Sequence, residues 1–415
     1  DSRSQVVVMG RPWKTLDASE YYPKKDFLWE EATGALDRLR EQYELIIVEG
    51  AGSAAELNLR KGDIVNMAIA RYANAPVLLA GDIDRGGIFA QLIGTVWLLE
   101  PEERKLIKGL IVNKFRGDIS LFYDGVEILQ EKSDIPVLGV VPYLHDLFIP
   151  EEDAVALENP FAIPAPSNEA TEIVVIHLPR IANFDDFDPL DAEPGVQIRY
   201  VDNPEQIGNP AAIIIPGTKS TINDLEWLRS QGFDETIQKY AQDGGNVVGI
   251  CGGYQMLGEM IYDPQNVESK QDNARGLGLL PLNTIFAKEK TTHQANAEIE
   301  NGSGWFSNLE GQTINGYEIH MGRTDSQSSW LKITERSGQS VQVLDGATSK
   351  DGKVWGCYVH GLFANENLRR AWLKDLGWNE KAGEKDPFAA SLTRLADTLE
   401  ETLDLEYLEK IIWEN

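Results

Sequence analysis

Cys251 lies in a sequence context that could activate a thiol. The apolar run Asn246–Ile250 precedes it, glycines flank it in Gly249-Ile-Cys-Gly-Gly253, and a helical pattern follows. The glycines permit a tight turn from strand to helix and leave space around the sulfur. The N-terminus of the next helix favours a thiolate, and the N–H of Gly252 would lie near a developing oxyanion. We therefore predict that Cys251 is a nucleophile; the alternative is a buried, inert cysteine.

A thiolate nucleophile needs a base, and His360 is the best placed of the five histidines. It ends the predicted strand Lys353–His360, and strand ends open at the carboxyl edge of an α/β sheet, where the cysteine turn also lies. Cys357 precedes it by three residues and is predicted to point to the opposite face, into the core. His320 is the competing histidine, with Glu318 on the same face of its segment. The remaining histidines, which have no supporting context, are His145, His177 and His293.

The segments around these residues resemble class I glutamine amidotransferase domains. Gly-Ile-Cys-Gly-Gly-Tyr-Gln and, downstream, Val-His-Gly-Leu-Phe carry the resemblance. It implies that Cys251 attacks the side-chain amide of glutamine, forms a thioester and releases ammonia, with His360 as acid and base. Ile215-Pro-Gly-Thr-Lys-Ser220 matches a second turn of these domains, so the N–H of Gly217 would complete the oxyanion hole with that of Gly252.

One position departs from this pattern. Most class I domains carry a glutamate two residues after the histidine, whereas this chain has Leu362. The subgroup that amidates corrinoid precursors also lacks this glutamate, so Leu362 favours that subgroup among the class I domains. Glu318 is our candidate for the group that orients His360.

Amide formation from a carboxylate requires activation, because oxide is a very poor leaving group. A carboxyl phosphate provides that activation, so we expect a site for ATP and Mg²⁺. Polar turns follow three predicted strands in the first part of the chain, and they contain Glu49, Gly50 and Gly52, then Asp82 and Asp84, then Asn113. The glycines would let the backbone approach phosphate, and Glu49 would bind Mg²⁺.

The apolar runs before these turns predict the fold. They are short and apolar at successive positions, which is typical of parallel strands covered on both faces. In the first part, the predicted strands are Leu45–Glu49, Pro76–Ala80, Gly109–Asn113 and Pro136–Val141, and the predicted helices are Asp26–Gln42, Ile64–Tyr72, Gly87–Leu99 and Ser120–Lys132. Gln5–Met9 also has the pattern of a strand. Further predicted strands are Glu172–His177, Ala211–Ile215, Asn246–Ile250 and Lys353–His360. We therefore predict an α/β protein with two doubly wound, mainly parallel sheet domains.

The composition restricts location and partners. Acidic residues outnumber basic ones by 66 to 38, which gives a formal net charge of −28. A negatively charged surface repels nucleic-acid phosphates and anionic lipids, so we expect neither nucleic acid nor a membrane surface as a partner. Uncharged stretches such as Gly86–Leu99 are shorter than the roughly 20 residues that cross a bilayer. With two cysteines and no recognisable signal segment, a reducing, cytoplasmic location is predicted.

The polar turns of the first part resemble the dethiobiotin-synthetase-like, P-loop-type domain of the cobyric acid synthase family. The matching segments are Ser4–Gly10, Glu49–Ser53, Asp82–Gly87, Asn113–Gly117 and Pro216–Thr221, followed by Cys251 and His360. The resemblance implies ATP- and glutamine-dependent amidation of peripheral carboxylates of adenosylcobyrinic acid a,c-diamide, giving adenosylcobyric acid in cobalamin biosynthesis. It also implies Mg²⁺ at Glu49 and adenine near Asn113.

The resulting domain prediction has four parts: a synthetase domain at 1–150, a linker at 151–171, an amidotransferase domain at 172–378 and a C-terminal docking helix at 379–415. The helix is predicted from an apolar stripe at helical spacing and is expected to pack on the second domain; its residues are Phe388, Leu392, Leu395, Leu399 and Leu403.

A glycine-rich phosphate loop of the form Gly-x-x-x-x-Gly-Lys-Ser/Thr does not occur in this sequence. We therefore expect the ATP-dependent half to be impaired in the chain as given. Two alternatives stay open: the related a,c-diamide synthase family, and a non-catalytic module that binds a corrinoid or a partner. Gly-Ala-Gly-Ser-x-x-Glu-x-Asn-Leu, at Gly50–Leu59, favours the cobyric acid synthase family, and the intact Cys251–His360 pair argues against a non-catalytic module.

Overall fold

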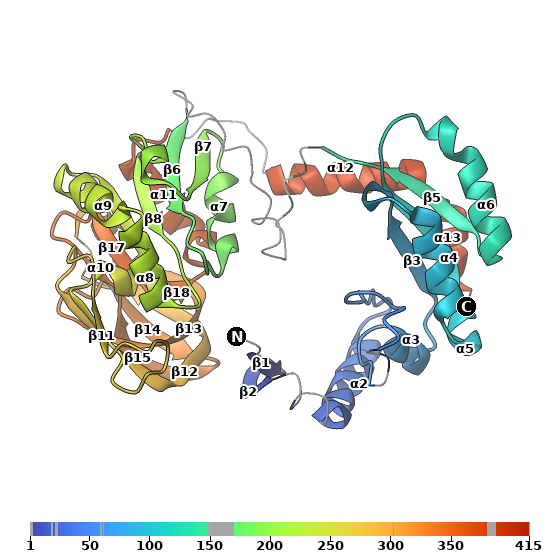
Figure 1. Ribbon diagram of the computed structural model, residues 1–415, viewed down its shortest axis with the longest axis horizontal. Coiled ribbons are helices and arrows are strands. Elements are labelled where there is room, and N and C mark those ends of the chain that lie inside the picture. Colours follow the sequence, from blue (N-terminus) through green and yellow to red (C-terminus); the bar gives the residue numbers. More distant parts are fainter. Residues whose placement is uncertain are drawn as a thin grey trace. The chain divides into compact units, whose positions relative to one another are not determined.

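The computed structural model describes residues 3–17, 20, 24–58, 60, 62–145, 147, 149, 170–301, 303–379 and 387–414. The chain forms two compact units, the first comprising residues 1–147 and 388–415 and the second residues 148–387 (Figure 1). Residues 151–169 of the predicted linker lie outside the described residues.

A three-stranded parallel sheet forms the centre of the first unit. Its order is β3 (Val77–Asp82), β4 (Ile107–Phe115) and β5 (Val137–Pro142). The helices of this unit that precede β5 are α2 (Lys25–Gln42), α3 (Met67–Ala73), α4 (Ile88–Leu98), α5 (Pro101–Arg104) and α6 (Tyr123–Ser133). Leu92 of α4 and Leu129 of α6 are buried together with Leu110 of β4. The three parallel strands and the four predicted helices of this unit are confirmed.

One predicted strand of this unit is wrong. Leu45–Glu49 is not part of any sheet, and Ile47 in its middle is 89% exposed. A strand exists only where a neighbour satisfies its N–H and C=O groups, and this segment pairs with no other described segment. By contrast, the strand expected at Gln5–Met9 is found as β1 (Arg3–Val8), which pairs antiparallel with β2 (Arg11–Asp17).

The C-terminal helices, α12 (Pro387–Thr402) and α13 (Leu405–Trp413), belong to the first unit. The expectation that this region packs on the second domain is therefore wrong. The chain after α12 covers the free edge of β5, where the N–H of Asp404 donates to the carbonyl of Leu138 at 2.8 Å. Gly139 permits this approach, because a Cβ there would collide with the carbonyl oxygen of Thr402.

A six-stranded sheet, parallel except for one edge strand, organises the second unit. Its order is β16 (Ala347–Thr348), β17 (Val354–Cys357), β9 (Asn246–Ile250), β8 (Ala212–Ile215), β6 (Thr171–Ile176) and β7 (Val196–Val201). The helices of this unit are α7 (Asp188–Asp191), α8 (Thr221–Ser230), α9 (Phe233–Gln242), α10 (Gly252–Leu257) and α11 (Glu366–Asp375). Every residue of β8 is fully buried, as expected for a strand covered on both faces. The predicted α/β fold with parallel sheets is confirmed.

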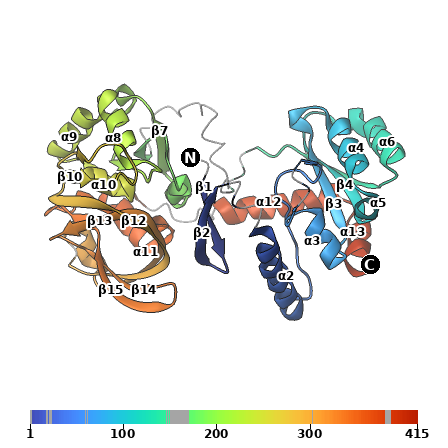
Figure 2. The same cartoon turned by 60° about the horizontal axis from the view of Figure 1, so that its bottom comes forward.

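A second, mainly antiparallel sheet was not predicted. Its strands are β10 (Met260–Tyr262), β11 (Asn273–Arg275), β12 (Leu282–Ile299), β13 (Thr313–Ser326), β14 (Leu331–Arg336), β15 (Gln339–Asp345) and β18 (Val359–His360). Figure 2 shows β12 to β15, in yellow to orange, on one side of this unit. The predicted strand Lys353–His360 divides between the two sheets: β17 pairs with β9, whereas β18 pairs with β13. No helix in the described ranges is long and apolar enough to span a bilayer.

Candidate active site

Cys251 occupies the turn between β9 and α10. Its backbone has φ 51° and ψ −107°, a conformation that is strained for a residue with a side chain. Glycine permits the close packing around this turn, because a Cβ at Gly253 would collide with the carbonyl oxygen of Ile215 at the end of β8. The predicted strand–turn–helix arrangement is therefore present, with the Cys251 side chain 7% exposed.

The two predicted oxyanion-hole glycines lie beside the catalytic candidates. A Cβ on Gly217 would lie 2.9 Å from Cε1 of His360, and a Cβ on Gly252 would lie 2.7 Å from Cγ2 of Thr218. The turn that contains Gly217 and Thr218 is thus in contact with both His360 and the start of α10. The N–H of Gly252 is the first of α10, a position that has no acceptor within its own helix.

His360 is held by a carboxylate that the sequence analysis did not single out. Its Nδ1 atom lies 2.6 Å from Oδ2 of Asp186, and Oδ1 of Asp186 accepts the N–H of Gly361 at 2.7 Å. His360 is 1% exposed, and its Nε2 atom is buried with no hydrogen-bond partner among the described residues.

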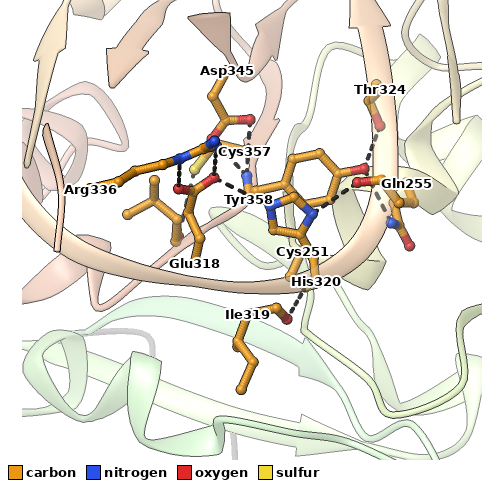
Figure 3. Close-up of polar contacts among 12 residues, drawn as sticks. Cys251, Gln255, Glu318, Ile319, His320, Thr324, Arg336, Asp345, Cys357 and Tyr358 are labelled. Atoms are coloured by element: carbon orange, nitrogen blue, oxygen red, sulfur yellow. Dashed lines mark hydrogen bonds and ion pairs between the residues drawn. The ribbon is translucent and has the colours of Figure 1, made fainter. Parts of the chain in front are cut away.

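The surroundings of His360 favour its protonated form. Burial by itself would lower the pKa of the imidazole. The charge and hydrogen bond of Asp186 outweigh that burial, and Cys251 adds a further rise, so the pKa reaches about 10. The Cys251 thiol itself donates to the carbonyl of Ile319 at 3.7 Å (Figure 3). A raised pKa allows the imidazole to hold the proton of a thiol, as a thiolate–imidazolium pair requires.

Glu318 does not orient His360, and that expectation is wrong. In the pairing of β13 with β18, Tyr317 lies opposite His360 and Glu318 lies opposite Val359. Because neighbouring residues of a strand face opposite sides, Glu318 points away from the imidazole. It instead accepts two hydrogen bonds from Arg336, at 2.6 and 2.7 Å (Figure 3).

Protein groups contact both ring nitrogens of His320, the competing histidine, which indicates a structural role. Nε2 lies 3.2 Å from Glu318 and Nδ1 lies 2.8 Å from the carbonyl of Gly322. Its ring stacks on Tyr358 with centroids 3.8 Å apart. Both nitrogens are therefore occupied by protein groups, unlike Nε2 of His360.

Cys357 lies in the core, as predicted. It is fully buried, and burial raises the pKa of its thiol well above the ordinary value. A thiol that resists ionisation is a poor nucleophile, so Cys251 is the reactive candidate of the two cysteines.

Asp186 gave only a weak signal in the sequence. It lies in Asn183-Phe-Asp-Asp-Phe187, where two acids stand between aromatic residues, and it is 174 positions from His360. The surrounding residues Phe184–Phe187 form a single 3-10 turn, so no periodic pattern marks the segment.

In the first unit, the structure brings Asp82, Asp84 and Asn113 to one edge of the parallel sheet. Asp82 and Asn113 are paired in register at the ends of β3 and β4. Asp82 forms an ion pair with Lys114 at 3.0 Å, and Asp84 forms one with Arg116 at 2.6 Å. The cations beside these carboxylates suit phosphate, but both carboxylates are already paired, and the described residues include no cluster of three or more His, Cys, Asp or Glu side chains that could hold a metal ion.

Hydrogen bonds with Asn66 fix the loop that contains Glu49, Gly50 and Gly52. Asn66 donates to the carbonyl of Ala51 at 2.8 Å and accepts the N–H of Ala51 at 3.0 Å. Ala51 and Gly52 line a cavity of about 510 Å³, but Glu49 and Gly50 do not. Glu49 is exposed and does not end a strand, contrary to expectation. Its role as a Mg²⁺ ligand stays a prediction.

Comparisons with known proteins give the same two-part organisation. A family model described as a CobB/CobQ-like glutamine amidotransferase domain matches residues 172–368, and one described as an AAA domain matches residues 20–151. The cobyric acid synthase of Roseiflexus castenholzii is 53% identical over 392 residues, covering 93% of this chain and 78% of the relative. The cobyric acid synthase of Chloroflexus aggregans is 52% identical over 416 residues, which cover 99% of this chain and 82% of the relative. Among solved structures, PurLQS from Thermotoga maritima is 19% identical with a TM-score of 0.39, covering 50% of this chain and 98% of the other.

Proposed function

The chain belongs to the cobyric acid synthase family of glutamine-hydrolysing amide ligases in cobalamin biosynthesis, and we propose that Cys251 and His360 supply its ammonia. The observation that carries this proposal is the position of Cys251 at a strained strand-to-helix turn, where the turn of Gly217 and Thr218 contacts both the start of α10 and the buried imidazole of His360. Residues 172–378 would then form the amidotransferase domain.

The geometry supports a two-step hydrolysis. Sγ of Cys251 attacks the side-chain amide carbon of glutamine after its proton passes to Nε2 of His360, and the oxyanion accepts the N–H groups of Gly217 and Gly252. The carbon–nitrogen bond breaks when Nε2 returns the proton to the leaving nitrogen, which releases ammonia and leaves a thioester. Water then attacks the thioester, His360 accepts its proton, and glutamate and the free thiol are formed.

The first unit, with residues 1–150 as its synthetase domain, would use this ammonia. When bound, ATP supplies the phosphoryl group that activates a substrate carboxylate, and Mg²⁺ neutralises phosphate charge. Glu49 would ligate Mg²⁺ and Asn113 would contact adenine. The remaining nucleotide-site residues in the proposal are Gly50, Gly52, Asp82 and Asp84.

The substrate we propose is a corrinoid with peripheral carboxylates, adenosylcobyrinic acid a,c-diamide, which would be converted to adenosylcobyric acid. The support comes from the names and coverage of the relatives, 78% and 82% of whose lengths align with this chain. A cytoplasmic location fits two free cysteines that are both buried.

Replacing Cys251 tests the amidotransferase assignment. Cys251→Ser should abolish glutamate release. In a version of the protein that also contains a glycine-rich phosphate loop, it should abolish glutamine-dependent amidation, while ATP-dependent amidation supplied with ammonium continues. Cys357→Ala is the matched control, because it removes the buried thiol and should leave glutamate release within about twofold of wild type. Equal loss of glutamine- and ammonium-dependent amidation in folded Cys251→Ser would contradict the assignment.

A further inference from the structure

We propose that Asp186 is the positioning residue of the Cys251–His360 pair. The inference rests on the proposed glutamine hydrolysis and adds a third member to its machinery. Leu362, two residues after the histidine, is buried and apolar and cannot accept a hydrogen bond from the ring. The carboxylate comes instead from the turn Phe184–Phe187, far away in the sequence.

Both carboxylate oxygens of Asp186 bind the segment that carries the histidine. Oδ2 contacts Nδ1 of His360 at 2.6 Å, and Oδ1 accepts the N–H of Gly361 at 2.7 Å. One side chain thus fixes both the ring and the backbone that follows it. Asp186 is 4% exposed, and a carboxylate buried to this extent needs a positively charged or hydrogen-bonding partner. The imidazole is that partner.

The turn that carries Asp186 is itself held in place. The N–H of Asp186 donates to the carbonyl of Asn183 at 3.1 Å, and the side-chain amide of Asn183 donates to the hydroxyl of Tyr317 at 2.7 Å. The ring of Tyr317 stacks on His360 with centroids 5.2 Å apart and an interplanar angle of 17°. His360 is therefore fixed at its edge by Asp186 and at its face by Tyr317.

This arrangement decides which nitrogen faces the reaction. With the Nδ1 proton donated to Asp186, Nε2 is left to exchange a proton with the thiol or the leaving nitrogen. The negative charge of Asp186 also stabilises the imidazolium that forms when Cys251 loses its proton. An asparagine at position 186 would lack that charge and would permit the other tautomer of the ring.

The test compares two neighbouring carboxylates in the full chain. Asp186→Asn should lower kcat for glutamine hydrolysis about 100-fold. Asp185→Asn is the matched control: Asp185 is exposed, forms no hydrogen bond with His360, and should stay within about threefold of wild type. In a version of the protein that also contains a glycine-rich phosphate loop, ammonium-dependent amidation should be unchanged in both variants.

A second readout separates positioning from general stability. The rate of Cys251 alkylation by iodoacetamide should fall at least about tenfold at pH 6 in Asp186→Asn but stay near wild type at pH 9.5, because the imidazolium no longer supports the thiolate. In wild type, ¹⁵N-histidine NMR should show a protonated Nδ1 on His360 at neutral pH, which requires no variant to fold.

Three results would overturn the inference: glutamine hydrolysis by Asp186→Asn within threefold of wild type, an unchanged alkylation profile, or an unprotonated Nδ1 on His360. Failure of the proposed function would look different, since the wild-type chain itself would then release no glutamate. The NMR signal would still decide whether Asp186 holds the ring.

Discussion

The Nδ1 atom of His360 lies 2.6 Å from Oδ2 of Asp186, although 174 positions separate the two residues. This contact depends on the division of one predicted strand between two sheets. β17 continues the parallel sheet beside β9, and the chain then turns at Tyr358 so that His360 pairs with Tyr317 of β13. The catalytic candidates are therefore positioned jointly by a parallel sheet, which carries Cys251, and an antiparallel one, which carries His360.

Glu268 should make the stability of the second unit depend on pH. Its carboxylate accepts hydrogen bonds from the hydroxyl of Thr221 and the N–H of Ile222, both at 3.3 Å. Burial raises the pKa of Glu268 to about 7. Because the folded state holds this proton more tightly than the unfolded state does, the free energy of unfolding should fall as pH rises from about 4.5 to 7.

Glu268→Gln, which cannot ionise, should therefore be more stable than wild type by about 1–2 kcal/mol at pH 8, and equal to it near pH 4.5. Urea unfolding at both pH values measures this difference. Glu259→Gln is the control, because Glu259 is exposed and its replacement should have little effect at either pH. A difference between Glu268→Gln and wild type that does not vary with pH would contradict the assigned titration.

Arg336 should contribute strongly to stability, because Glu318 is only 1% exposed. Burial would raise the pKa of Glu318, but His320 and Arg336 outweigh it and hold the pKa below its ordinary value. Arg336→Met leaves the buried carboxylate with less compensation and should cost about 3 kcal/mol at pH 7, with a smaller cost once acid protonates Glu318.

Lys332→Met provides the comparison for Arg336→Met. Lys332 pairs with Glu300 at 2.9 Å, but the two side chains are 26% and 33% exposed. A pair that water reaches should contribute less than about 1 kcal/mol. Denaturant unfolding of the two variants measures both costs, and equal costs would show that burial of Glu318 does not determine its contribution.

Local sequence patterns predicted the elements that depend on their own residues. The β9 strand and the Cys251 turn were predictable because a continuous apolar run, glycines and a helical pattern follow one another directly. Leu45–Glu49 has a similar apolar run, yet no described segment pairs with it, and pairing is not a property of the run itself. The antiparallel sheet was missed because strands such as β12 alternate buried and exposed residues instead of forming continuous apolar runs.

The group that orients His360 could not be read from sequence for a related reason. Glu318 was the candidate from sequence, but register places it opposite Val359 and on the other face of β13 from Tyr317, which lies opposite His360. Asp186 lies in a short 3-10 turn without periodicity, and only the folded chain brings that turn to β18. Contacts between distant segments depend on topology and register, which short motifs do not specify.

Glu49 provides the test of the nucleotide half. It is exposed, in an extended segment next to the turn that Asn66 holds, so Glu49→Gln should leave the free energy of unfolding within about 0.5 kcal/mol of wild type. If the carboxylate ligates Mg²⁺, loss of its charge should lower ATP-dependent amidation at least about 100-fold in a version of the protein that also contains a glycine-rich phosphate loop, while glutamine hydrolysis is retained. Glu44→Gln, a second exposed carboxylate five residues earlier in the sequence, should change neither activity. Unchanged ATP turnover by Glu49→Gln across a Mg²⁺ titration would remove Glu49 from the metal site. The oxygen donors Asp82 and Asp84 at the edge of the parallel sheet would then be the next candidates, because they already lie beside the cations that suit a phosphate.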